Sequence, residues 1–136
     1  MRVLVIDGMG GGIGKLIIEK VKAGLNAVEI MAVGTNTVAT TVMLKAGADF
    51  GATGENAVVY NSSRADYIIG VVGIILANSM HGEVSPKMAE AVSLSAAHKI
   101  LIPIEKCSVT VMGVAAAPIQ VYVDEVVNKL REFDTK

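Results

Sequence analysis

Aliphatic runs and amphipathic stretches alternate along the chain. The first run, Val3 to Ile6, consists of aliphatic residues without a polar interruption. Such a run is typical of a strand that is covered on both faces, as the strands of a parallel sheet are. Patterns of this kind predict strands at residues 3–6, 27–33, 66–72, 99–104 and 109–114.

The stretches between these strands predict helices. Apolar residues recur at helical spacing after the first strand and again near the C-terminus. Ser85 followed by Pro86 is a strong helix start, and Thr35 or Asn36 is the expected N-cap of another helix. The predicted helices cover residues 13–23, 35–46, a short segment that opens near Thr53, 85–96 and 118–133.

The alternation of strands and helices predicts the fold class. Successive strands joined through helices form a mostly parallel sheet with helices on both faces. We therefore expect a three-layer, Rossmann-like α/β fold, a single domain over residues 1–136 with a sheet of about five strands. The link between the last two predicted strands is too short for a helical crossover, which leaves the strand at 109–114 free to run antiparallel.

Composition narrows the classes of function. A single cysteine, Cys107, excludes an internal disulfide. No signal-peptide pattern opens the chain, and its longest apolar stretch, residues 67–77, is too short to cross a membrane. We therefore expect a cytoplasmic protein without a membrane partner. The net charge of −1, with scattered acids and bases, provides no basic face for nucleic acid.

The balance of apolar and charged residues predicts self-association. Hydrophobic residues make up 52% of the chain and charged residues 18%, against about 25% charged in a typical soluble domain. A small domain has little interior in which to bury so many apolar side chains. We therefore expect a homo-oligomer, with a closed dimer as the default.

A glycine-rich turn follows the first predicted strand. Glycine lets a ligand approach the backbone closely, and the free N–H groups and the dipole at a helix N-terminus attract an anion. A plain tight turn needs only one or two glycines, so the sequence predicts that a phosphate or a nucleotide binds here. The predicted contacts are Gly8, Gly10, Gly11, Gly12, Ile13 and Gly14.

The residues that flank the turn, Asp7 and Lys15, have several possible roles. Asp7 can hold Mg²⁺, bind a ligand hydroxyl, or hold the loop through backbone N–H groups, and the last role is the simplest. Lys15 can touch a phosphate or lie on the surface in the first helical turn. The two histidines and the cysteine lack the spacing of metal ligands, so no metal site is predicted.

Two known phosphate loops are partly matched. Gly8, Gly12 and Gly14 have the G-x-x-x-G-x-G spacing and resemble the cofactor loop of short-chain dehydrogenases, which implies NAD(P) as one possible cofactor. The Tyr-x-x-x-Lys pair of those enzymes is missing, and residues 33–36 offer neither an acid for the adenosine ribose nor an arginine. The loop also resembles a P-loop, but Met9 and Leu16 replace its first glycine and its hydroxyl residue.

Polar residues follow other predicted strands. Because ligands of open α/β sheets bind beyond the carboxyl ends of the strands, we expect these residues near the glycine-rich turn. The further binding candidates are Gly34, Thr35, Asn36, Thr53, Asn78 and Ser79. Thr35, Asn36 and Thr53 can instead be helix caps. The roles of His81, Glu83 and Cys107 stay open.

Several segments together resemble a known family. They read IDGMGGGIGK at residues 6–15, GTN at 34–36, MLKAGA at 43–48, GATGENA at 51–57 and ANSM at 77–80. In this combination the chain resembles small bacterial proteins of the domain of unknown function family 3842, over nearly its whole length. The resemblance implies a bacterial cytoplasmic protein and the same polar segments as site candidates. It implies no particular reaction.

The sequence leaves three classes of function. The first is a module that binds a nucleotide or another phosphorylated small molecule. The second is a small enzyme, either an NAD(P)-dependent reductase or a phosphoryl-transfer enzyme, whose catalytic residues the sequence does not identify. The third is a structural or partner subunit in which the glycine-rich turn only shapes the backbone.

Overall fold

Five parallel strands form one sheet. The computed structural model describes residues 1–104 and 108–135. Within them the strand order is β3-β2-β1-β4-β5, and every neighbouring pair is parallel. The strands are β1 (Arg2–Asp7), β2 (Glu29–Gly34), β3 (Phe50–Thr53), β4 (Tyr67–Val71) and β5 (His98–Ile102).

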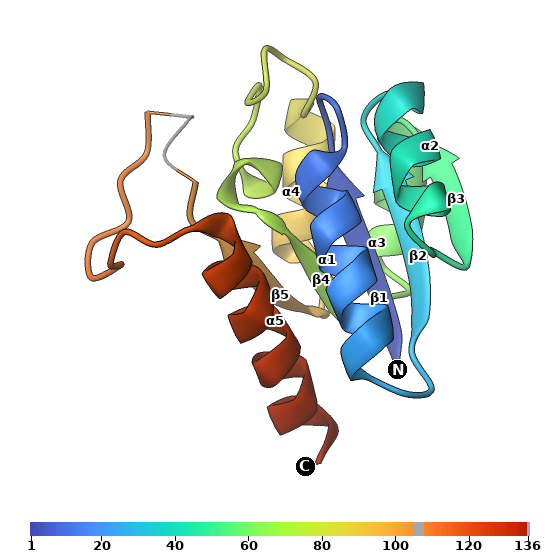
Figure 1. Cartoon of the computed structure of the whole chain (residues 1–136). Coiled ribbons are helices and arrows are strands. Elements are labelled where there is room, and N and C mark those ends of the chain that lie inside the picture. Colours follow the sequence, from blue (N-terminus) through green and yellow to red (C-terminus); the bar gives the residue numbers. More distant parts are fainter. Residues whose placement is uncertain (105–107, 136) are drawn as a thin grey trace.

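Helices cover both faces of the sheet, which confirms the predicted three-layer α/β class (Figure 1). Helices α1, α2 and α5 pack on one face, and α3 and α4 pack on the other. Among the described residues, no helix has the length and apolar character needed to cross a membrane. The helices are α1 (Gly12–Gly24), α2 (Thr37–Lys45), α3 (Glu55–Ser62), α4 (Pro86–Leu94) and α5 (Ile119–Asp134), with a 3₁₀ turn, η1 (Val72–Ile75), after β4.

The uninterrupted aliphatic run of β1 follows from its central place in the sheet. Val3 and Val5 are buried in the core under α1, α2 and α5. Leu4 and Ile6 are buried in the second core, under α3 and α4. A strand alternates its side chains between the two faces, so a strand covered on both sides is apolar at every position.

Two strand predictions were wrong, although the number of strands was right. Phe50–Thr53 was not predicted as a strand, because it is a short, mostly exposed edge strand without an apolar alternation. Residues 109–114 were predicted as a strand, but they lie in an irregular, mostly exposed segment between β5 and α5. β-branched residues favour a strand only where a neighbouring strand pairs with their backbone, and β5 pairs with β4 on its inner side. Because residues 109–114 form no strand, the expectation that they could run antiparallel no longer applies.

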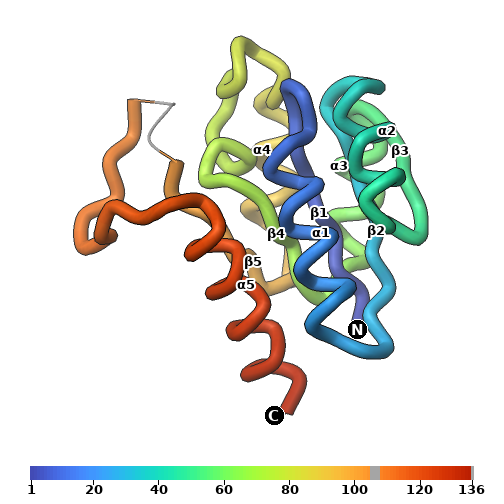
Figure 2. Tube along the Cα trace, viewed as in Figure 1, coloured from blue at the N-terminus to red at the C-terminus, as the bar shows by residue number. Residues whose placement is uncertain are grey.

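The strand order creates one position suited to a ligand. After β1 the chain continues to β2 and β3 on one side of the sheet, and after β4 it continues to β5 on the other (Figure 2). The carboxyl ends of β1 and β4 therefore flank the point at which the strand order reverses. Open α/β sheets bind their ligands at this point, because the two loops diverge there and leave a crevice.

Candidate functional site

Asp7 holds the glycine-rich loop in place. Its carboxylate lies at the end of β1, is buried, and accepts hydrogen bonds from the backbone N–H of Gly8 at 2.8 Å and of Gly14 at 2.7 Å. Burial raises the pKa of Asp7, and the hydrogen bonds from Gly14 and Gly8 oppose that shift. The interpretation that Asp7 fixes the loop through backbone N–H groups is confirmed.

Three of the loop glycines are required by packing. A Cβ at Gly8 would lie 2.5 Å from Thr35 Oγ1, and a Cβ at Gly14 would lie 2.5 Å from Met43 Sδ. Gly11 has a positive φ of 75° and lies against the backbone of α2. Packing and backbone conformation therefore explain Gly8, Gly11 and Gly14. They do not explain the other two glycines of the turn, Gly10 and Gly12.

Gly10 and Gly12 have no such requirement. A Cβ at either position would meet no other atom within 4 Å, and neither residue has a positive φ. Both are exposed, and no group of the described residues accepts a hydrogen bond from either N–H. Gly12 is also the first residue of α1, whose first turn contains no acidic residue. The free N–H of Gly12 at the positive end of α1, with the free N–H of Gly10 two residues before it, suits an anion.

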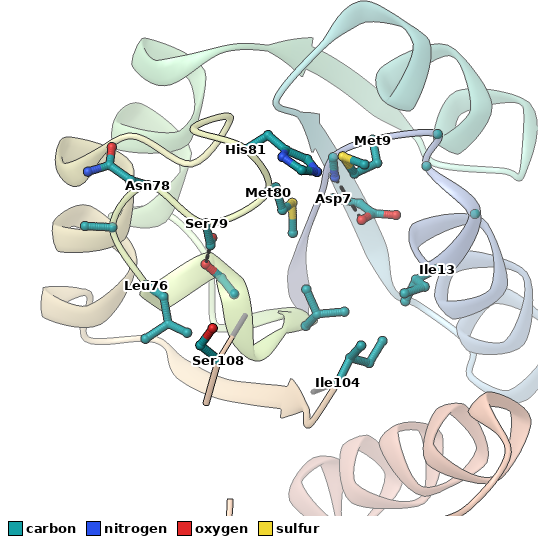
Figure 3. Close-up of a pocket in the computed structure, with 17 residues that line it drawn as sticks. Asp7, Met9, Ile13, Leu76, Asn78, Ser79, Met80, His81, Ile104 and Ser108 are labelled. Carbon is teal, nitrogen blue, oxygen red and sulfur yellow. Dashed lines mark hydrogen bonds between the residues drawn. The ribbon is translucent and has the colours of Figure 1, made fainter. Parts of the chain in front are cut away.

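A cavity of about 630 Å³ opens beside these two glycines. It lies between the loop after β1 and the segment after β4, at the reversal of the strand order (Figure 3). Its lining residues are Asp7, Gly8, Met9, Gly10, Gly11, Gly12, Ile13, Val71, Gly73, Leu76, Ala77, Asn78, Ser79, Met80, His81, Ile104 and Ser108. The volume falls within the range of small-molecule sites.

The cavity wall combines polar and apolar groups. The backbone of the glycine-rich loop, with Ile13 next to it, lies on one side, and Leu76 and Ile104 lie across the cavity with Ser79 and Ser108 near them (Figure 3). Ser79 donates its hydroxyl hydrogen to the carbonyl of Gly73 and so fixes the segment after η1. The arrangement can hold a molecule with one anionic end and one apolar end.

Glu83 links the glycine-rich loop to the end of β2, a role that the sequence had left open. Its Oε1 accepts hydrogen bonds from Met9 N at 3.0 Å, from Thr35 Oγ1 at 2.5 Å and from Asn36 Nδ2 at 2.8 Å. These donors lower the pKa of the Glu83 carboxyl, with the hydroxyl of Thr35 as the largest cause. The ionised carboxylate is therefore the form that the folded protein stabilises.

The structure brings only part of the predicted site together. Asp7, Gly8, Gly10, Gly11, Gly12, Ile13, Asn78 and Ser79 line the cavity. Gly14 packs against Met43 and Asp7, and the exposed Lys15 pairs with Glu19 at 4.0 Å. Neither is among the lining residues.

The predicted residues from β2 and β3 also lie outside the cavity lining. Asn36 caps α2 by accepting a hydrogen bond from Ala39 N, and Thr53 Oγ1 lies 2.7 Å from Thr40 Oγ1. Gly34 packs against Thr40, and Thr35 contacts Glu83.

Part of the apolar lining of the cavity was missed by the sequence reasoning. Leu76 and Ile104 were not among the predicted contacts, whereas Ala77 and Met80 belong to the segment 77–80 that the family resemblance had marked as a candidate. Cys107 lies outside the described residues, and within those residues no group of acids, histidines and cysteines could hold a metal ion.

The lowered pKa of Glu83 predicts a pH-dependent contribution to stability. Because the folded-state pKa is below the ordinary value of 4.5, this contribution is present above pH 4.5 and is lost as the pH falls through the lowered value. Glu83→Gln should therefore reduce the free energy of unfolding near pH 7, and the difference from the wild type should shrink below about pH 4. Urea unfolding of both proteins between pH 3 and 8 measures this. A difference that stays constant across the range would contradict the assignment.

The fold is a Rossmann-type α/β fold with a cavity between the ends of β1 and β4. The chain belongs to the family described as "Domain of unknown function (DUF3842)", whose model matches residues 2–135. No curated protein matches the chain. Among solved structures, a dodecameric FMN-dependent Ubix-like decarboxylase from Escherichia coli O157:H7 is similar, with 18% sequence identity and a TM-score of 0.49 over 96% of this chain and 77% of that chain.

Proposed function

We propose that the protein binds a small phosphate-bearing molecule, a nucleotide or another phosphorylated metabolite, in the cavity between β1 and β4. The observation that carries this proposal is the pair Gly10 and Gly12, whose missing side chains and free N–H groups serve no contact among the described residues. A phosphate bound to these N–H groups would explain why both residues are glycine, because any side chain there would occupy the space that the phosphate needs.

The electrostatics of the loop support a phosphate. The carboxylate of Asp7 is directed at the N–H groups of Gly8 and Gly14, so its charge is already compensated by backbone donors. The N-terminus of α1 carries a partial positive charge of roughly half a unit. Among the described residues the cavity lining contains no lysine or arginine, and the loop N–H groups are donors that a phosphate can use.

A binding role is favoured over catalysis by the same lining. Its ionisable side chains within the described residues are Asp7 and His81. Asp7 accepts hydrogen bonds from the loop backbone, which leaves His81 as the one other ionisable side chain of the described lining. The NAD(P)-dependent reductase and the phosphoryl-transfer enzyme therefore remain alternatives to be tested. A purely structural loop, as in a partner subunit, leaves Gly10 and Gly12 unexplained.

Thermal-shift measurements test the proposal. The panel contains NAD(P)H, FMN, FAD, AMP, ATP, coenzyme A, sugar phosphates, inorganic phosphate and sulfate. A ligand at a hundred times its Kd stabilises the folded state by about 2.7 kcal/mol, which raises the melting temperature measurably. At least one phosphate compound should do so. If none does, inorganic phosphate and sulfate included, the proposed site is wrong. Turnover of NAD(P)H or ATP would instead favour one of the enzymes.

We also propose that the chain forms a homo-oligomer. The segment 108–118 between β5 and α5 contains no charged residue, and its side chains Val111, Met112 and Val114 are exposed, Met112 at 87%. Figure 1 shows this segment extending away from the sheet. Exposed apolar side chains gathered in one uncharged segment are typical of a surface that another chain covers.

Light scattering tests the oligomer. We expect a mass that is a multiple of 14.1 kDa at micromolar concentration. Met112→Glu should shift the equilibrium toward the monomer, because a carboxylate is costly to bury in an apolar contact. Leu94→Glu, a matched change at an exposed apolar residue of α4, should not shift it. A wild-type mass of 14.1 kDa that does not grow with concentration would contradict the proposal.

A further inference from the structure

The space beside β2 is already filled by the protein itself. In Rossmann-type dinucleotide sites the pyrophosphate crosses the glycine-rich loop and the adenosine ribose lies at the end of β2. Here the carboxylate of Glu83 lies between the loop and the end of β2, with Oε1 held at 3.0 Å by Met9 N and at 2.8 Å by Asn36 Nδ2. The N–H of Met9 already donates to Glu83, and a ribose at the end of β2 would have to displace this hydrogen-bonded carboxylate.

The packing around Gly8 shows the same closure. A Cβ on Gly8 would meet Thr35 Oγ1 at 2.5 Å, Met80 Sδ at 2.8 Å and Glu83 Oε1 at 2.9 Å. Thr35 and the turn that carries Met80 and Glu83 therefore both pack against the loop at Gly8. None of Thr35, Asn36 and Glu83 is among the lining residues of the cavity, which extends instead toward β4.

The turn that carries Glu83 is closed by its own backbone. Asn78 N donates to Val84 O at 2.7 Å, and Glu83 N donates to Met80 O at 3.0 Å. Glu83 is therefore held at its backbone as well as at its carboxylate. Rotating the side chain away from β2 would break the three hydrogen bonds to its carboxylate, so the resting structure keeps this side closed.

The open side of the cavity suits one ring system. From Gly10 and Gly12 the cavity runs toward the apolar side chains of Leu76 and Ile104, which lie near Ser79 and Ser108 (Figure 3). Apolar side chains attract a flat ring more than they attract a bare sugar, because burial of apolar surface is the driving force there. A single phosphate at the loop and a single ring at the apolar side use the space that the fold leaves open.

We infer that the ligand is a mononucleotide, a phosphate monoester with one ring system, and that Glu83 excludes dinucleotides by closing the β2 side. This inference rests on the proposed function, since it assumes a phosphate at Gly10 and Gly12. It assigns to Glu83 the role of a specificity-determining residue that acts by occupying space and hydrogen-bond donors.

Matched ligand pairs test the inference by isothermal titration calorimetry on the full chain. AMP is compared with NAD⁺, FMN with FAD, and AMP with ribose 5-phosphate. AMP or FMN should bind at least about tenfold more tightly than its dinucleotide, and the ring-bearing monophosphate should bind at least about tenfold more tightly than ribose 5-phosphate. Glu83→Ala should reduce the mononucleotide preference to about threefold or less, while Glu83→Gln, which keeps an acceptor oxygen, should retain most of it.

The outcomes separate this inference from the proposed function. A dinucleotide that binds as tightly as its mononucleotide half overturns the inference and leaves phosphate binding standing. The same holds if ribose 5-phosphate binds as tightly as AMP and FMN, or if folded Glu83→Ala keeps the full wild-type preference. If none of these compounds binds, and inorganic phosphate does not bind either, the proposed function fails and the inference fails with it. Circular dichroism of each variant shows whether the fold is retained.

Discussion

Gly12→Val should weaken the binding of phosphate compounds at least about tenfold and leave the fold almost unchanged. A Cβ at Gly12 meets no other atom of the chain within 4 Å, and the residue is exposed at the start of α1. Exposed substitutions of this kind typically change stability by less than about 0.5 kcal/mol. The valine side chain would instead occupy the space in front of the free N–H groups. Losing one hydrogen bond to a charged ligand costs about 1.5–3 kcal/mol, so affinity should fall at least about tenfold.

Two control variants make this result interpretable. Lys15→Ala should change affinity by less than about twofold, because Lys15 lies outside the cavity lining and pairs with Glu19. Gly14→Ala should mainly lower stability, because its Cβ would lie 2.5 Å from Met43 Sδ. Calorimetric titration and thermal melts of the three variants separate the two effects. If Gly12→Val binds as the wild type does, the phosphate does not lie on this loop.

Asp7→Ala should be among the most destabilising changes in the protein. The carboxylate is buried and is the acceptor for the backbone N–H groups of Gly8 and Gly14. Without it those donors lose their partner, and a buried, unsatisfied N–H costs about 1–3 kcal/mol. Removing the carboxylate also removes its own burial cost, which raises the pKa of Asp7 and partly offsets the loss. We expect a net loss of about 2–4 kcal/mol, which corresponds to a melting temperature lower by roughly 10 °C.

Asp7→Asn is the informative companion variant. The amide keeps one acceptor oxygen and turns an N–H₂ group toward the other backbone donor, so about half of the loss should remain. Chemical denaturation of both variants gives the two values. A stability equal to that of the wild type in Asp7→Ala would mean that the burial cost cancels both hydrogen bonds. The backbone bond from Gly11 N to Gly8 O at 3.0 Å would then be sufficient to hold the turn.

The central part of the fold could be predicted from local patterns. The apolar run of β1, the glycine-rich turn and the helix start at Ser85–Pro86 each depend on interactions within a few residues. Their order along the chain was sufficient for the α/β class, because a parallel sheet with helical crossovers has few ways to pack. The edges of the sheet were predicted poorly. β3 pairs with β2, whereas no strand pairs with residues 109–114. Whether a segment finds a pairing strand cannot be read from its local sequence.

The candidate site divides in the same way. The sequence by itself identified the loop from Asp7 to Gly14, because five glycines at a strand–helix junction have a local meaning. Only the tertiary structure separated Gly8, Gly11 and Gly14, which meet atoms of Thr35, α2 and Met43, from Gly10 and Gly12, which meet nothing.

Contacts between distant segments decided the rest. Glu83 reaches Met9 across 74 positions of sequence and Thr35 across 48, and Leu76 lines the same cavity as the loop only because β4 lies next to β1. Glycine content, capping and aliphatic runs are properties of neighbouring residues, and the sequence determines them directly. Which side of the loop is closed and which is open depends on how three separate segments pack together, and only the folded chain brings those segments within reach of one another.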